Sequence, residues 1–131
     1  MLIPKINILN KLNKDPNNYK LNLDLGMIYV NEKDFTKAKF IFKKLIQNNK
    51  NRYEGFLNLS NIYAIYKKYS ESEKILKNYL KKNGYNKEII TGLASIYYQS
   101  ENYKKLNILI DQNINQENNH ILFFIKSIIY E

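Results

Sequence analysis

The chain offers few side chains that could carry out chemistry. Two carboxylate pairs, Glu71 with Glu73 and Asp24 near Glu32, are of the type that serves general acid–base catalysis. Both pairs fall on expected helix surfaces, where a solvated charge is the usual explanation. There is no cysteine, and the single histidine, His120, lies in a polar stretch. Thiolate sites and His-based metal clusters are therefore excluded, and we expect no cofactor and no metal.

The known catalytic motifs are also missing. The sequence contains no nucleophile elbow, no glycine-rich phosphate loop and no metal-ligand spacing. The chain is therefore not expected to be an enzyme. No hydrophobic run reaches the roughly 18 residues that a membrane-spanning helix needs, and the first twelve residues do not resemble a signal peptide. The cytoplasm is the expected location.

The net charge of +9, from 21 basic and 12 acidic residues, has two explanations. The abundance of Asn, Lys, Ile and Tyr is typical of an AT-rich genome. A basic surface can also bind nucleic acid or an anionic membrane. The lysines are scattered along the sequence, and Arg52 is the only arginine, although arginine is the usual residue for bidentate phosphate and base contacts. The sequence therefore favours the first explanation and makes nucleic acid or membrane a less favoured partner.

Apolar and aromatic residues recur along the chain with a constant 34-residue step, and this repeat sets the elements that would position any binding surface. Four sets of three residues keep this step: Leu25, Leu59 and Leu93; Ile28, Ile62 and Ile96; Tyr29, Tyr63 and Tyr97; Phe42, Leu76 and Ile110. A fixed period of this length is the signature of a solenoid, in which one supersecondary unit stacks on copies of itself. Function is then expected on an extended surface and not in a catalytic pocket.

Each repeat is predicted to form two helices joined by a tight turn. In residues 53–86, apolar side chains recur at steps of three or four on either side of a polar break at 67–70. Asn-rich stretches separate the repeats, and Gly84 suits the conformation just past a helix end. The same spacing predicts helices over residues 21–31, 35–47, 88–100 and 103–114.

Both ends have the pattern of incomplete repeats. Residues 5–14 are predicted to form a lone second helix, and residues 121–130 a lone first helix. We expect seven helices in all and no strand. In the last helix, Phe124 and Ile128 are expected to pack on the preceding repeat, near Leu109 and Ile110. The opposite face would then lack a partner, which predicts self-association through residues 121–130 or cover by further sequence. The members of that opposite face are Leu122, Ile125 and Ile129. The alternative is that residues 115–119 fold this helix back into the groove and hide both faces.

The repeat pattern resembles the tetratricopeptide repeat. In the first unit, Leu25-Gly26 and Tyr29 are followed by the small Ala38 and the aromatic Phe42, and Asp15-Pro16 precedes the unit. The small residues at these positions let the two helices of a pair approach closely. Two positions depart from the family pattern: Leu106 is large where a small residue is usual, and Asn22 stands where Trp is usual. The third helix pair is therefore expected to be splayed or rotated.

The resemblance implies an all-α superhelix of antiparallel helix pairs that forms a single domain. Its divisions are a half-repeat at 1–18, repeats at 19–52, 53–86 and 87–120, and a half-repeat at 121–131. The family's geometry places the first helix of each pair on a concave groove that holds a peptide or helix. The implied groove residues are Lys20, Leu23, Asp24, Met27, Asn31, Glu54, Leu57, Asn58, Asn61, Ile65, Glu88, Thr91, Ser95, Tyr98 and Gln99.

One subclass of the family clamps the C-terminal carboxylate of heat-shock chaperones. The corresponding positions here hold Leu23, Met27, Asn58, Glu88 and Gly92, and only Asn58 fits. Glu88 would repel a carboxylate, so we exclude this partner. The mixture of apolar and amide side chains suits an extended or helical peptide with a few apolar anchors. Two alternatives stay open: an interaction module of a larger protein such as a transferase, and a basic surface for nucleic acid or membrane.

Overall fold

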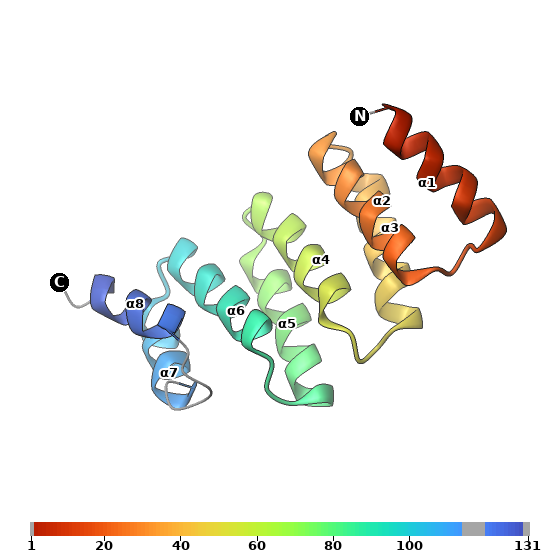
Figure 1. Ribbon diagram of the computed structural model, residues 1–131. Coiled ribbons are helices and arrows are strands. Elements are labelled where there is room, and N and C mark those ends of the chain that lie inside the picture. The colour runs from red at the N-terminus through yellow and green to blue at the C-terminus, as the bar shows by residue number, and fades with distance from the viewer. Residues whose placement is uncertain (1, 114–119, 130–131) are drawn as a thin grey trace.

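The computed structural model describes residues 2–113 and 120–129. Within these residues the chain forms eight helices and no strand, which confirms the all-α prediction. The predicted number of seven is wrong, because three helix pairs and two flanking helices make eight. The helices are α1 (Leu2–Lys14), α2 (Tyr19–Asn31), α3 (Phe35–Asn48), α4 (Tyr53–Ile65), α5 (Tyr69–Asn83), α6 (Lys87–Gln99), α7 (Tyr103–Asn113) and α8 (His120–Ile129). They stack in an elongated row with the two termini at opposite ends (Figure 1).

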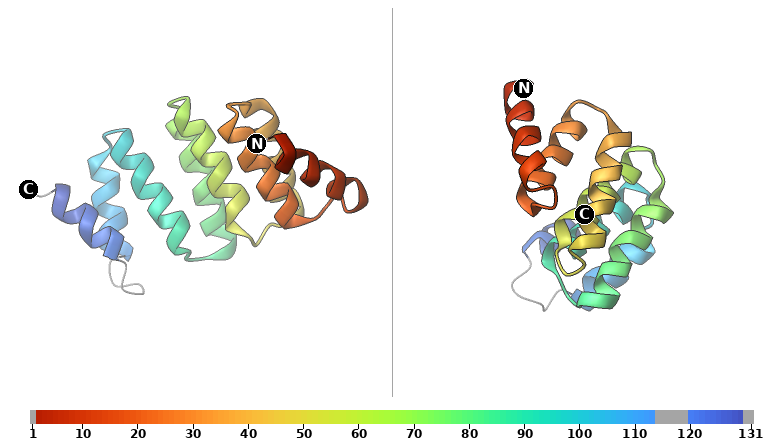
Figure 2. Two further views of the ribbon diagram at one scale, coloured as in Figure 1. Left: turned by 45° about the horizontal axis from the view of Figure 1, so that its top comes forward. Right: turned by 90° about the vertical axis from the view of Figure 1, so that its right-hand side faces the viewer.

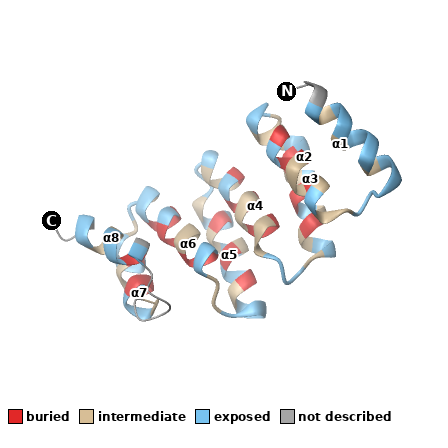
Figure 3. Ribbon diagram, viewed as in Figure 1, coloured by how far each residue is buried: buried red, intermediate tan, exposed pale blue. Residues whose placement is uncertain are grey.

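The helices form three pairs, α2 with α3, α4 with α5, and α6 with α7. The second helix of each pair also packs on the first helix of the next, so every unit contacts its neighbour. Buried residues recur on every helix from α2 to α8, whereas the described residues of α1 are exposed or half-buried (Figure 3). Stacking thus buries a continuous core that no single pair could form alone.

The turn inside each pair is built three times in the same way. Lys33, Lys67 and Glu101, which follow one another at the 34-residue step, have φ values of 60°, 57° and 58°. The backbone N–H of the next residue donates to the carbonyl of the repeated tyrosine five positions earlier, at 2.8–2.9 Å. This bond belongs to the motif that ends a helix with one left-handed residue. The repeat period is therefore present in the backbone as well as in the side chains.

The small residues lie where the paired helices approach. A Cβ atom on Gly26 would stand 2.6 Å from the Phe42 ring, and Ala38 is fully buried. In the second pair, Ser60 and Ser72 are fully buried against each other. Leu106 fills the corresponding position in the third pair, where α6 and α7 make a less extensive contact than the first two pairs. Helix α7 is also shorter than α3 and α5 in the described residues, and the splayed or rotated geometry of the third pair stays a prediction.

Asn22 is buried although its side chain is polar. Its amide nitrogen donates to the carbonyl of Pro16 at 2.9 Å and to that of Asn18 at 2.8 Å. The side chain of Asn18 in turn accepts from the N–H of Leu21 and caps α2. The departure from the family's Trp position is therefore compensated by hydrogen bonds that fix the turn between α1 and α2.

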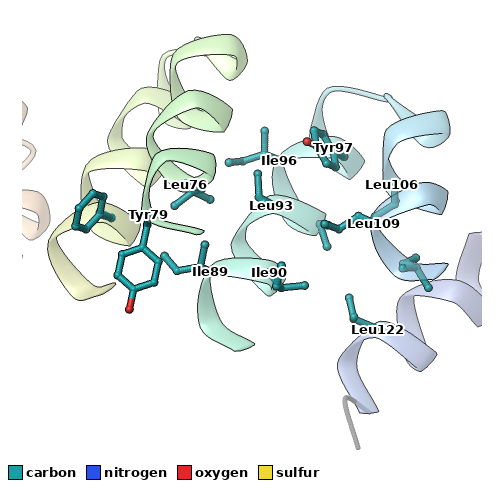
Figure 4. Close-up of a cluster of buried hydrophobic side chains, with 13 residues drawn as sticks. Leu76, Tyr79, Ile89, Ile90, Leu93, Ile96, Tyr97, Leu106, Leu109 and Leu122 are labelled. Carbon is teal, nitrogen blue, oxygen red and sulfur yellow. The ribbon is translucent and has the colours of Figure 1, made fainter. Parts of the chain in front are cut away.

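The larger hydrophobic cluster joins the last two repeats. It runs from Leu76 in α5 through Leu93 in α6 to Leu106 in α7 and Leu122 in α8 (Figure 4). A second cluster, around Phe42 and Leu45, joins the first two repeats. Because both clusters cross repeat boundaries, they hold the orientation of each first helix relative to the next.

The face that α8 turns to the core differs from the prediction. Leu122 is fully buried and Ile125 packs against the core cluster, whereas Phe124 is 66% exposed and Ile128 46% exposed. The predicted role of the Ile129 side chain lies outside what the structure describes, and so does the alternative path of residues 115–119.

Ile128 occupies the position that Ala94 holds one repeat earlier, where a small residue lets two helices approach. In the earlier repeats this position faces the second helix of the same pair, as Gly26 faces Phe42 and Ser60 faces Ser72. No helix follows α8 in the described residues, so Ile128 stays exposed while α8 buries the stripe of Leu122 and Ile125.

Candidate peptide-binding groove

The first helices of the pairs form the inner layer of the row. Helix α4 packs on α6, and α6 on α8, whereas no two second helices make a comparable contact within residues 2–113. Helices that approach more closely in one layer than in the other bend the row toward that layer. The inner, concave side is therefore carried by α4 and α6, with α2 as their equivalent at the 34-residue step, and the outer side by the second helices α3, α5 and α7. Helix α1 packs on α2 at the end of the row, which Figure 2 shows from two further sides.

All 15 predicted groove residues keep accessible surface. Nine are exposed, and the other six, among them Leu23, Asp24 and Thr91, are half-buried. On the same helices, residues such as Leu25, Leu59 and Leu93 are buried toward the second helices. The 3.6-residue period of an amphipathic helix separates the two sets. The predicted residues therefore lie on the solvent-accessible side of α2, α4 and α6.

Leu57 has a structural role in addition to any contact with a partner. It is half-buried and packs against the core cluster between α4 and α6. A Cβ atom on Gly92 would stand 2.8 Å from its Cδ1 atom, so the absence of a side chain on Gly92 makes room for Leu57. Leu57 thus seals the contact between two inner helices. Met27 and Ile65, which are 39% and 55% exposed, are more accessible apolar side chains of this layer.

Glu54 is held in a contact between repeats. The hydroxyl of Tyr19 in α2 donates a hydrogen bond to its carboxylate, across from α2 to α4. The guanidinium of Arg52 stacks on the Tyr19 ring, 3.9 Å from the ring centre. Burial, followed by the hydrogen bond to Glu54, raises the pKa of the Tyr19 hydroxyl well above its usual value. This cluster orients two neighbouring first helices at the edge of the groove.

Other polar groove residues bond mostly within their own helix. Asn58 donates to the carbonyl of Glu54 at 2.8 Å, and Thr91 to that of Lys87 at 2.8 Å. Gln99 donates to the hydroxyl of Ser95 at 2.9 Å. By contrast, the exposed amide of Asn61 has no hydrogen-bond partner within the described residues. An amide with free donors and acceptors can bond to the backbone of an extended peptide.

The two layers differ sharply in charge. Helices α2, α4 and α6 carry two lysines against three carboxylates, a net charge of −1. Helices α1, α3, α5 and α7 carry thirteen lysines against three carboxylates, a net charge of +10. Lysines that are scattered in the sequence are therefore gathered on the outer layer and on α1, and the inner face is slightly acidic on a protein of net charge +9.

A small apolar pocket lies between α6 and α8. Its volume is about 250 Å³, and it is lined by Thr91, Ala94, Ser95, Tyr98, Ile125 and Ile128. Sequence reasoning missed the last two as lining residues, because it assigned α8 a different orientation. The register held a partial signal: Ile125 follows Thr91 by one repeat period and Leu57 by two. The pocket is large enough for one apolar side chain of a bound peptide.

The carboxylates considered for chemistry each have a structural setting. Asp24 accepts from Lys20 at 2.7 Å, and Glu32 pairs with Lys5 at 2.8 Å. Glu71 is exposed, but Glu73 is not the simple surface charge that was expected, because its side chain is only 18% exposed. It accepts from Lys77 and Lys105 and from the Tyr97 hydroxyl, and so joins α5, α6 and α7. His120 is exposed at the start of α8.

Solved structures with the same arrangement are tetratricopeptide-repeat proteins. YrrB, a protein of this class with an unusual peptide-binding site, superimposes with a TM-score of 0.68 at 12% identity over 90% of this chain. A protein from Parabacteroides merdae superimposes with a TM-score of 0.70 at 17% sequence identity over 94% of this chain. For MamA of MSR-1 the TM-score is 0.62 at 14% identity, also over 94% of this chain. The chain spans 61%, 52% and 66% of these proteins, respectively.

Neither a protein-family model nor a curated protein sequence matches the chain. The likeness in structure, together with the 34-residue period, establishes that the chain has the tetratricopeptide-repeat fold, a superhelical solenoid of helix pairs.

Proposed function

We propose that the chain is a non-catalytic interaction module that binds a short peptide or helix along the inner face of α2, α4 and α6. The observation that carries this proposal is the apolar pocket between α6 and α8, which continues the row of accessible groove residues. Met27 and Ile65 supply further apolar contacts, and Asn61 supplies an amide for the peptide backbone. The slightly acidic inner face supports a peptide without net negative charge.

A peptide-display selection tests the proposal, because it can be run before any partner is identified. Peptides enriched on the chain are expected to carry a large apolar residue and to be neutral or basic. Binding of a selected peptide is then compared among variants by fluorescence anisotropy. Tyr98→Ala is expected to weaken binding about tenfold, since an aromatic side chain on a pocket wall supplies about 1.4 kcal/mol or more.

Two matched controls stand on the outer layer. Phe40→Ala removes an aromatic side chain that is 71% exposed on α3, and Asn78→Ala removes an exposed amide on α5. Both are expected to bind the peptide like the unmodified chain, whereas Asn61→Ala binds it more weakly. If Tyr98→Ala and Asn61→Ala bind as well as the controls do, the inner face is not the binding site.

A further proposal concerns α8, whose Phe123, Phe124 and Ile128 are 49%, 66% and 46% exposed. We propose that this face is covered by the same helix of a second copy. The alternative is an interaction module within a larger protein such as a transferase. A native reading frame longer than the 131 residues of this sequence, supplying a covering helix, would favour the alternative.

A further inference from the structure

The outer layer carries a repeated row of accessible side chains at the middle of each second helix. Ile6 in α1, Phe40 in α3, Lys74 in α5 and Ile108 in α7 follow one another at the 34-residue step and occupy equivalent positions. Ile6 is 45% exposed, Phe40 71% and Ile108 48%. Three of the four positions therefore present a large apolar side chain to solvent, and two of these, Phe40 and Ile108, lie on the second helices, which face away from the groove.

Lysines surround this row. Lys43 follows Phe40 by one turn, Lys77 and Lys81 extend the row of Lys74, and Lys104 precedes Ile108. Of the three carboxylates in these four helices, Glu73 is occupied by Lys77 and Lys105, and Asp111 pairs with Lys126. In the described part of the chain, Lys43, Lys74, Lys81 and Lys104 have no carboxylate within ion-pair distance. Their charges are free to meet an external anion.

Two hollows open on this layer. One, of about 690 Å³, lies over α5 and reaches Lys105 of α7; Lys74, Lys77 and Lys81 line it together with Glu73. The other, of about 480 Å³, lies between α2 and α3, where Phe40 stands beside Leu25 and Ile41. The middle of the outer layer thus offers a basic depression over α5 and an apolar one at α3.

Alternating lysines and exposed apolar side chains suit an anionic lipid surface better than a nucleic acid. Ile6 and Ile108 are aliphatic and have no ring to stack on a base, and helices α1, α3, α5 and α7 contain no arginine. At a bilayer, apolar side chains enter the region below the headgroups while lysines stay among the phosphates. No helix in the described part of the chain is long and apolar enough to cross a membrane, so such binding would be peripheral.

We propose that the outer face of α3 and α5, extended by α7, docks on the surface of an anionic lipid bilayer. Phe40 is the central apolar contact, and Lys43, Lys74 and Lys81 are the central headgroup contacts. A convex face meets a flat bilayer over its middle helices, which makes α3 and α5 the core of the contact. The inner groove faces the other way and stays open to a peptide.

Co-sedimentation with vesicles tests this docking surface. The chain is mixed with vesicles of phosphatidylcholine alone, or with vesicles of two parts phosphatidylcholine to one part phosphatidylserine. Binding is expected for the second set only, and it weakens as salt is added. Replacing Lys43, Lys74 and Lys81 by Gln lowers the affinity about 100-fold, at about fivefold per lysine. Phe40→Ser lowers it about tenfold, because the apolar insertion is lost.

Matched controls separate this surface from general charge. Lys20→Gln with Lys87→Gln removes exposed lysines from the inner helices, and Met27→Ser removes an exposed apolar side chain there. These variants should bind the anionic vesicles nearly as well as the unmodified chain. Circular dichroism checks that every variant keeps its helices, which is expected because the substituted side chains are exposed.

Three results would overturn the proposal. One is equal binding to neutral and anionic vesicles, or no binding to either. Another is a loss of affinity for anionic vesicles in the inner-face control variants that is as large as the loss in the outer-face variants. The third is tighter binding of a single-stranded RNA or a DNA duplex than of anionic vesicles, with the same lysine variants reducing it, which would assign the surface to nucleic acid.

Discussion

The hydroxyl oxygens of Ser60 and Ser72 lie 3.2 Å apart, fully buried where α4 crosses α5. Ser72 also donates to the backbone carbonyl of Ser60. These two residues occupy the small-residue positions that Gly26 and Ala38 occupy in the first pair. The second pair therefore combines close approach of the helices with a polar link between them, and the link has every buried hydroxyl satisfied.

Replacing Ser72 with Ala is expected to lower the free energy of unfolding by about 1–2 kcal/mol, because the Ser60 hydroxyl is then buried without its partner. The free energy of unfolding of the Ser60→Ala, Ser72→Ala double variant should be no lower than that of the Ser72→Ala variant, because neither hydroxyl is then left buried without its partner. Urea denaturation of the two single variants and the double variant measures these differences. Fully additive losses would show that the two hydroxyls do not interact.

Gly26→Ala should lower the free energy of unfolding by about 1–3 kcal/mol, because the new methyl group would stand 2.6 Å from the rigid, fully buried ring of Phe42. Gly92→Ala is the matched control: its methyl group meets the ends of Leu57 and Leu76 at 2.8 and 3.2 Å, and these flexible side chains can move. Gly92→Ala should therefore lower the free energy of unfolding by less than Gly26→Ala does. Thermal melts that rank the two variants the other way would contradict this account of the first helix pair.

Much of the fold could be predicted from the sequence, because the same geometry is imposed three times. The backbone carbonyls of the repeated Tyr29, Tyr63 and Tyr97 each accept the hydrogen bond that closes the turn of their own pair. The spacing of these tyrosines therefore matches the spacing of the turns. The small residues report the close approach of the helices. The accessibility of the groove residues followed from the same period, since positions not used for packing stay exposed.

Features that depend on packing between repeats could not be predicted. Glu73 has the sequence context of a surface carboxylate, and only the fold brings Lys105 and Tyr97 to it from other helices. The predicted orientation of α8 was wrong because apolar residues cover nearly every face of that helix, so its pattern alone does not select the stripe to bury. The gathering of lysines on the outer layer depends on which helix carries each of them.

The carboxylate of Glu73 should stabilise the chain at neutral pH. Burial alone would raise its pKa, but hydrogen bonds from Lys77, Lys105 and Tyr97 together lower it below the ordinary value of 4.5. A carboxyl whose pKa is lowered on folding contributes stability above that ordinary value, and the contribution is lost as the pH falls through the folded-state pKa. Glu73→Gln should therefore cost about 1 kcal/mol at pH 7.

Chemical denaturation at several pH values tests this prediction. The difference in free energy of unfolding between the unmodified chain and Glu73→Gln should have its largest value at pH 6–7. It should shrink as the solution is acidified below the ordinary pKa of 4.5. Glu71→Gln, which alters an exposed carboxylate two residues away, should be nearly neutral throughout. A cost for Glu73→Gln that does not change with pH would mean that the ionised carboxylate is not the source of the stability.

The exposed side of α8 predicts association between copies of the chain. Phe124 and Ile128 stand one helical turn apart and are 66% and 46% exposed, and Phe123 is 49% exposed. Each such side chain gains roughly 1.5–3 kcal/mol when it is fully buried. An apolar patch of this kind on one short helix is typical of an interface. The average molar mass measured by light scattering should therefore rise with concentration toward that of a dimer.

Phe124→Glu should keep the chain monomeric, because a carboxylate would be buried without a partner at the centre of the contact. Phe40→Glu is the matched control, since it makes the same replacement at an exposed phenylalanine on the outer layer. In the absence of lipid it should associate like the unmodified chain. Ile125→Glu is not a suitable test, because Ile125 packs against the core and the variant would unfold α8 as well. A chain that stays monomeric at every concentration, or a Phe40→Glu variant that also fails to associate, would show that α8 does not join two copies.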